Sequence, residues 1–175
     1  MSTSETNKIQ YFEYFLSKLY NHLGQKDSND LSIVKSQKLL YFLSNSIKEE
    51  DKYPLFETFD NFYALPYGHV ESDIYKAIKS ESGFKLSHFV ISRFGAKKIL
   101  DFSFNNLDSV TEKIDLAFES LKNTGLIEKS ASYLVDLSHC HESWVKNFRE
   151  ALKLNLNSKF IEKDDLTNEY KYFAL

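Results

Sequence analysis

The sequence has little of what builds disulfide-rich or turn-rich proteins. Of its 175 residues, one is cysteine, two are proline and five are glycine. Cys140 has no second cysteine with which to form an internal disulfide, and one thiol excludes a cysteine-rich zinc site. Because glycine and proline are the main interruptions of helices, their scarcity favours long helices over a fold of many short strands.

Long apolar runs and a surplus of basic charge are also missing. The longest purely apolar run is residues 39–43, whereas a helix needs about 20 such residues to span a bilayer. Residues 1–10 are polar and do not resemble a signal peptide. The net charge is −3, from 22 basic and 25 acidic side chains, so the surplus that drives nucleic-acid binding is absent. We therefore expect a cytoplasmic protein whose partner is neither a membrane nor a nucleic acid, although a local basic patch stays open.

The remaining composition is that of a globular protein. Hydrophobic residues make up 42% and charged residues 27% of the chain, as in ordinary folded domains. The length fits one domain, and a chain of this size buries roughly 70% of its extended surface. We expect a single compact domain over residues 1–175 that is mainly α.

Apolar residues spaced three and four apart predict the helices. We expect helices over 8–23, 32–50 and 71–81, with Ser32 or Ser36 capping the second and Gly83 following the third. A capping box of Ser109 and Glu112 predicts a fourth helix, closed by Gly125. A short helix from Ser130 or Ser132, a helix capped by Ser138 and a last one near 163–172 follow. The predicted inward-facing residues of the last two long helices are Leu107, Val110, Ile114, Ala117, Phe118, Leu121, Trp144, Val145, Phe148 and Leu152.

Two stretches do not read as helix. Pro66 and Gly68 make a clear break, and the aromatic residues 55–66 before it are ambiguous. Further on, residues 89–91 and the alternating Leu100, Phe102 and Phe104 are typical of strands, with a turn at Gly95. The pattern therefore allows a short β-hairpin near 85–104 in an otherwise helical fold.

The densest group of chemically active side chains is His139, Cys140 and His141. On a helix, ligands two residues apart point in nearly opposite directions, so all three cannot hold one ion. A thiolate nucleophile needs a geometry that adjacency does not provide, and buried or half-buried cysteines are usually inert. No phosphate-binding glycine loop or zinc-protease motif is present. We predict no cofactor, no metal and no catalytic residues, and hence a binding protein in place of an enzyme.

Three segments, in their order and spacing, resemble one family. The first is the helix 36–42 with Gln37, Lys38 and Tyr41. The second is the turn 62–70 with Tyr67, Gly68 and His69, followed by Tyr75. The third is the corner 131–139 with Ser138 and His139, followed by Trp144. Together these segments are similar to the Panacea domain of SocA-like antitoxins and proteolytic adaptors.

The resemblance covers residues 8–150 and leaves 155–175 as a C-terminal extension. It implies an all-helical or mainly helical scaffold in which the motif residues form either a buried hydrogen-bond network or a partner-binding groove. Core packing is the alternative for Tyr41 and Trp144, and a positive backbone angle for Gly68. The chain departs from the family at His69, where proline is usual; this side chain can titrate near neutral pH. The motif residues are Gln37, Lys38, Tyr41, Tyr67, Gly68, His69, Tyr75, Ser138, His139 and Trp144.

The function implied by the resemblance is that of an antitoxin from a bacterium or phage. Such a protein neutralises a partner toxin, encoded nearby, by direct contact. The alternative is an adaptor that delivers its partner to a protease. A third hypothesis is a metal protein or enzyme that uses His139, Cys140, His141 or His69. The identity of the toxin, the binding surface and the oligomeric state are not defined by the sequence.

Overall fold

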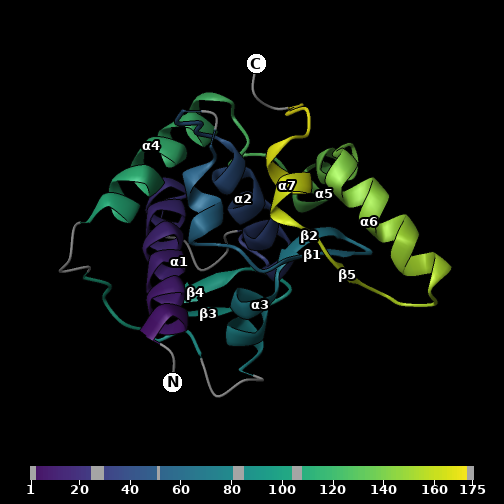
Figure 1. Cartoon of the computed structure of the whole chain (residues 1–175). Helices are drawn as coiled ribbons and strands as arrows, with labels where there is room; N and C mark the ends of the chain where they lie inside the picture. The colour runs from purple at the N-terminus through teal and green to yellow at the C-terminus, as the bar shows by residue number, and fades with distance from the viewer. Residues whose placement is uncertain (1–2, 25–29, 51, 81–84, 104–107, 173–175) are drawn as a thin grey trace.

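The computed structural model of the chain describes residues 3–24, 30–50, 52–80, 85–103 and 108–172, with side chains described from residue 7 onward. The described structure is 54% helical, with about 12% strand. The prediction of a mainly α fold is therefore confirmed, and small sheets accompany the helices (Figure 1). The helices are α1 (Thr3–His22), α2 (Ile33–Asn45), α3 (Ser72–Lys79), α4 (Ser109–Asn123), α5 (Ala131–His139), α6 (Glu142–Lys153) and α7 (Lys163–Thr167), with a 3-10 turn, η1 (Pro54–Glu57).

Helix α2 runs through the centre of the molecule, surrounded by other elements (Figure 1). Every residue from Lys35 to Asn45 is buried, as expected for a helix that is apolar on all sides. Ser32 caps its start by accepting a hydrogen bond from the Lys35 N–H at 3.2 Å. The helix ends at Asn45, five residues before the predicted end, and the charged residues 48–50 that follow are exposed.

A hairpin occupies the segment that the sequence left ambiguous. Strands β1 (Phe62–Leu65) and β2 (Gly68–Glu71) pair antiparallel, with Leu65 opposite Gly68. The short β5 (Lys159–Phe160) lies on the other side of β1, so the strand order is β2-β1-β5. Gly68 adopts a φ of 92°, which only glycine adopts at little cost. The predicted break at residues 66–68 is the turn of this hairpin.

The second predicted hairpin is present, but its second strand lies elsewhere. Strand β3 (Phe89–Ile91) pairs with β4 (Ala96–Lys98), whereas the sequence placed the return strand at Leu100, Phe102 and Phe104. The tight turn at Gly95 brings Ala96 directly opposite Ile91. The three residues of β3 are therefore all paired by Lys98, and no residue of β3 remains to pair with Leu100. Leu100 is 59% exposed, and Phe104 lies outside the described residues.

Several predicted helix ends were wrong by a residue or more. The capping box of α4 is formed by Asp108 and Thr111 instead of Ser109 and Glu112. Ser138 does not cap α6: it lies buried inside α5, and His141 precedes α6. The last helix is shorter than predicted, and Leu152 is 56% exposed instead of facing inward. Gly83 and Leu107 lie outside the described residues.

One hydrophobic core joins most of these elements. It collects buried side chains from α1, α2, α4, the hairpin β1–β2 and the C-terminal segment, including Phe12, Phe42, Phe62, Leu121 and Ile161. The predicted core positions Leu39, Leu40, Tyr41 and Leu134 are buried, while Leu137 and Trp144 pack against the core from its edge. The core thus holds α2, the β1–β2 turn and α5 together, and these carry the motif residues.

Candidate functional site

Side chains from two helices bind the outer edge of strand β2. Strand β2 has one strand neighbour, β1, so its other edge presents unpaired backbone groups. The Gln37 Oε1 atom accepts from the Glu71 N–H at 2.9 Å, and the Ser138 hydroxyl accepts from the His69 N–H at 3.2 Å. The Lys38 ammonium donates to the His69 carbonyl. Three motif residues therefore take the place of a neighbouring strand.

His69 lies at the centre of this buried network. Its ring stacks on Tyr41, with centroids 3.7 Å apart and an angle of 6°. The Nδ1 atom lies 2.8 Å from the Ser138 hydroxyl and Nε2 lies 2.7 Å from the Ser143 hydroxyl. Burial, together with the nearby His141 and Lys38, holds the pKa of His69 well below its ordinary value. The expectation that His69 titrates near neutral pH was wrong, because desolvation disfavours the imidazolium.

The C-terminal extension completes the network. The Tyr41 hydroxyl donates to Glu169 Oε1 at 2.6 Å, and the Ser143 N–H donates to Glu169 Oε2 at 2.8 Å. Burial and the Glu169 carboxylate raise the pKa of Tyr41 well above its ordinary value. Lys171 lies 3.4 Å from Glu169, and burial lowers the pKa of Lys171 to about 8. Local patterns do not reveal Ser143 or Glu169, because Glu169 lies 128 residues from Tyr41 and 26 residues from Ser143.

Lys38 is a buried cation whose hydrogen bond goes to a carbonyl. Lys38 is only 1% exposed. Its ammonium forms no ion pair with any of the described residues. Burial lowers the pKa of Lys38 from 10.5 to about 7, since the charged form loses its hydration. Near neutral pH this lysine therefore exists in both protonation states.

This low pKa predicts how stability changes with pH. Between about pH 7 and 10.5 the unfolded state holds a proton that the folded state has lost, so the contribution of Lys38 to stability rises with pH in that window;. We expect the difference in unfolding free energy between wild type and Lys38→Met to shift in favour of wild type by roughly 2–3 kcal/mol from pH 7 to 9.5. Below pH 7 the difference stays constant.

Urea denaturation of both proteins at pH 6.5, 8 and 9.5 measures this difference. Taking the difference cancels groups that titrate alike in both proteins. The exposed Lys79→Met variant is the control and should differ from wild type by a small, constant amount. A Lys38→Met difference that is equally flat across the three pH values contradicts a depressed Lys38 pKa.

A pocket of about 420 Å³ opens beside the network, between α2, the β1–β2 turn and α3. Four motif residues line it, namely Gln37, Lys38, Tyr67 and Tyr75. Its walls are apolar, and its remaining polar residues are Lys79 and Arg93. The Gln37 Nε2 atom is buried and has no hydrogen-bond partner in the described part of the chain. A residue that lines the pocket thus carries a buried donor without a partner in the described part of the chain.

The other motif residues hold the turn that borders this pocket. The Trp144 indole N–H donates to the Leu65 carbonyl at 2.8 Å, and His139 stacks on Trp144 at a centroid distance of 3.8 Å. Tyr67, at the tip of the turn, is 67% exposed. The ten motif residues therefore come together in one region. Some form the buried network, some support the turn, and some line the pocket.

The neighbouring residues His139, Cys140 and His141 face different surroundings. His139 stacks on Trp144, whereas the His141 Nδ1–H donates to the Leu137 carbonyl at 3.0 Å and the His141 ring packs edge-on to Tyr41. Cys140 is exposed, with its thiol 3.4 Å from the Asp136 carbonyl. The three side chains therefore do not converge on one point.

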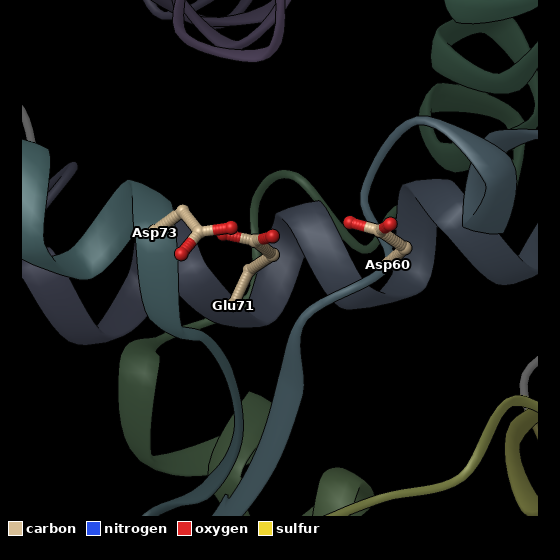
Figure 2. A group of neighbouring side chains, drawn as sticks. All are labelled: Asp60, Glu71 and Asp73. Atoms are coloured by element: carbon tan, nitrogen blue, oxygen red, sulfur yellow. The ribbon is translucent and has the colours of Figure 1, made fainter. Parts of the chain in front are cut away.

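A second cluster joins α1 to the start of α3. The carboxylates of Asp60, Glu71 and Asp73 approach one another, as Figure 2 shows. The Lys8 ammonium lies 2.6 Å from Asp60, 2.8 Å from Glu71 and 2.7 Å from Asp73. Lys8 thus occupies the position that a metal ion would take between these carboxylates. This cluster was not predicted from the sequence, because Lys8 is separated from its three carboxylate partners by more than 50 residues.

The charges in this cluster do not balance. Burial alone would lower the pKa of Lys8, but the attraction of Glu71 and the hydrogen bonds to all three carboxylates outweigh it and raise the pKa. Burial raises the pKa of Glu71 by more than Lys8 lowers it, and Asp73 adds to the rise. One ammonium therefore serves three carboxylates, of which Glu71 is fully buried.

No family model, curated protein or solved structure matches this chain. Among the described residues, no helix combines the length and apolar character needed to cross a bilayer.

Proposed function

We propose that this protein is a binding module that neutralises a protein partner by direct contact, as an antitoxin of the Panacea type would. The observation that carries the proposal is the pocket beside the β1–β2 turn. Four motif residues line it, and Tyr67 stands exposed at its edge. Tyrosine and arginine beside a desolvated pocket are the side chains that most often dominate protein interfaces.

The rigidity of the turn also supports the proposal. The Trp144 indole N–H binds the Leu65 carbonyl at the end of the first strand, and the Lys38 ammonium binds the His69 carbonyl in the second. An exposed side chain on a fixed backbone loses little entropy on binding, so more of its contact energy appears as affinity. The backbone at Tyr67 is therefore already held in place before a partner binds.

The partner that we propose is a protein toxin in the cytoplasm. A net charge of −3 does not favour nucleic acid as the partner;. We favour occlusion of the partner as the mechanism. Delivery to a protease would use the same contact, but it would shorten the lifetime of the partner.

Co-expression with the product of the neighbouring gene, followed by purification and a growth assay, tests this function. We expect a stoichiometric complex, restored growth and an unchanged half-life of the partner. The Tyr67→Ala variant should weaken the complex by roughly 30-fold or more, because hot-spot residues contribute about 2 kcal/mol or more. Binding constants of the purified proteins measure the change.

Tyr170→Ala is the matched control. Tyr170 is 68% exposed, against 67% for Tyr67, but it does not line the pocket. Equal affinities of the two variants would place the contact elsewhere on the protein. Growth arrest that persists with every neighbouring gene product would contradict the antitoxin function itself, and a shortened partner half-life would favour the adaptor.

A further inference from the structure

The unsatisfied amide of Gln37 points to a missing acceptor. Its Oε1 atom is engaged by the Glu71 N–H, which fixes the orientation of the amide. The Nε2 atom is buried and has no partner among the described residues, although the residue lines an open pocket. A buried donor without an acceptor destabilises the folded state, and an unseen ligand, water or ion is one explanation for its presence.

Lys38 adds a second donor from the next position of α2. An ammonium has three N–H groups, and the structure gives that of Lys38 one acceptor, the His69 carbonyl. Lys38 lines the same pocket as Gln37. Two adjacent residues thus offer an amide donor and a cationic donor to whatever fills the pocket.

The charge of the lining has one sign. Lys38, Lys79 and Arg93 contribute three cationic side chains, and no aspartate or glutamate lines the pocket. Lys79 and Arg93 are exposed and come from separate elements, α3 and the turn between β3 and β4. Positive charge from several sides attracts an anion and guides it toward the buried donors.

The walls of the pocket decide what kind of anion fits. Ile33, Val34, Leu65 and Val70 make them apolar, so the ligand carries an apolar group. A volume of about 420 Å³ is in the range of ligand pockets;. Phosphate is usually bound by backbone N–H groups at a helix N-terminus, whereas Gln37 and Lys38 lie within α2. Two side-chain donors match the two oxygens of a carboxylate.

We propose that this pocket binds the C-terminal residue of the partner polypeptide, with its carboxylate at Gln37 and Lys38 and its apolar side chain against Val34 and Val70. A chain end carries a carboxylate and an apolar side chain on one residue, as the pocket requires. Capture of a terminal carboxylate is an established mode of peptide recognition. The proposal rests on the proposed function in that the peptide belongs to the bound partner.

The first test uses short peptide probes and the full-length protein. Calorimetry compares acetyl-Ala-Ala-Leu with a free carboxylate and the same peptide with a C-terminal amide. We expect the acid to bind and the amide to bind at least tenfold more weakly. Inorganic phosphate serves as a second anion and should not compete with the acid.

The pH dependence of this binding reports on Lys38. Its pKa of about 7 in the free protein rises when an anion binds beside it. Affinity for the acid should therefore fall by roughly tenfold or more between pH 6.5 and 8.5, with proton uptake on binding. A neutral peptide amide should show neither effect.

Two pocket variants separate binding from folding. Gln37→Glu keeps the oxygen that accepts from the Glu71 N–H but replaces the donor NH₂ by oxygen. This variant should bind the peptide acid at least tenfold more weakly. Val34→Phe fills the pocket from a half-buried position outside the hydrogen-bond network and should also abolish binding. Lys76→Gln, on the exposed face of α3 outside the pocket, is the control and should bind like wild type.

Equal binding of acid and amide, or binding that survives both pocket variants, would overturn the proposal, as would tighter binding of phosphate. A partner complex that needs Tyr67 but tolerates an amidated or extended partner C-terminus would overturn the pocket assignment and leave the proposed function intact. Conversely, the peptide acid could bind at Gln37 and Lys38 while co-expression restores growth with no neighbouring gene product. That result would contradict the antitoxin function and support the carboxylate site.

Discussion

Replacing Gly68 with alanine is expected to lower the free energy of unfolding by about 3–5 kcal/mol, since three unfavourable effects combine. The φ of 92° strains any side chain at this position;. The added Cβ would overlap the Ser138 hydroxyl oxygen and lie 3.0 Å from Lys38 Cε. Ser138 cannot turn away without losing its hydrogen bonds to the backbone and ring of His69.

Gly125→Ala is the matched control for this substitution. Gly125 also has a positive φ, 67°, but nothing lies within 4 Å of the position of an added Cβ. Gly125→Ala should lower the free energy of unfolding by only about 1 kcal/mol, from backbone strain alone. Urea denaturation of both variants measures the difference. If Gly68→Ala costs no more than Gly125→Ala, then Ser138 and Lys38 do not hold the β2 edge as tightly as described.

The helices were predictable because their signals are local. The block 39–43 is apolar on every side, and α2 is buried on every side. Exact ends were harder to predict, because a cap depends on one rotamer. Asp108 and Ser109 are both good N-cap residues, and Asp108 prevailed because Thr111 returns its hydrogen bond.

The hairpin β1–β2 could not be predicted in this way. Each strand has only four residues, β1 is apolar or aromatic throughout, and β2 buries its polar residues His69 and Glu71 along with Val70. The pattern of polar and apolar residues therefore does not mark the buried faces of these strands. Its outer edge is satisfied by Gln37, Lys38 and Ser138, which lie 31 to 69 residues away in the sequence. Contacts of this kind leave no local pattern, and only the fold reveals them.

The candidate site was predictable in its members but not in their roles. The motif comparison brought together ten residues, which the structure places in one region. Whether they formed a buried network or a groove stayed open, because polar residues at the same helical spacing serve either purpose. The structure shows a buried network with a pocket beside it: His69 and Tyr41 lie inside the network, while Gln37 and Lys38 belong to the network and also line the pocket.

This double membership connects stability to binding. The Gln37 oxygen accepts from the Glu71 N–H of β2, while the Gln37 nitrogen is buried without a partner among the described residues. Lys38 donates to the His69 carbonyl and lines the same pocket. A ligand in the pocket would therefore satisfy groups that are now buried without full hydration. Ligand binding should therefore raise the free energy of unfolding of the protein, with the effect centred on the β1–β2 turn.

Replacing Lys8 with methionine is expected to be at least as damaging, at about 3–5 kcal/mol, because it leaves a buried carboxylate without its partner. Lys8 is 6% exposed and Glu71 is fully buried. Methionine preserves the packing of the aliphatic stem, so the loss reports mainly on charge. Lys18→Met, on the same helix, removes an ion pair whose side chains are 27% and 43% exposed, and should cost less than about 1 kcal/mol.

Two further measurements show that charge is responsible for the Lys8 effect. Without Lys8, the pKa of Glu71 rises further above its unfolded value, so the folded state binds the extra proton and the deficit shrinks as pH falls from 7 toward 4;. The double variant Lys8→Met, Glu71→Gln should recover most of the loss, since the Gln oxygen still accepts from the Ile74 N–H. A deficit that is independent of pH and unchanged in the double variant would instead assign the role of Lys8 to packing.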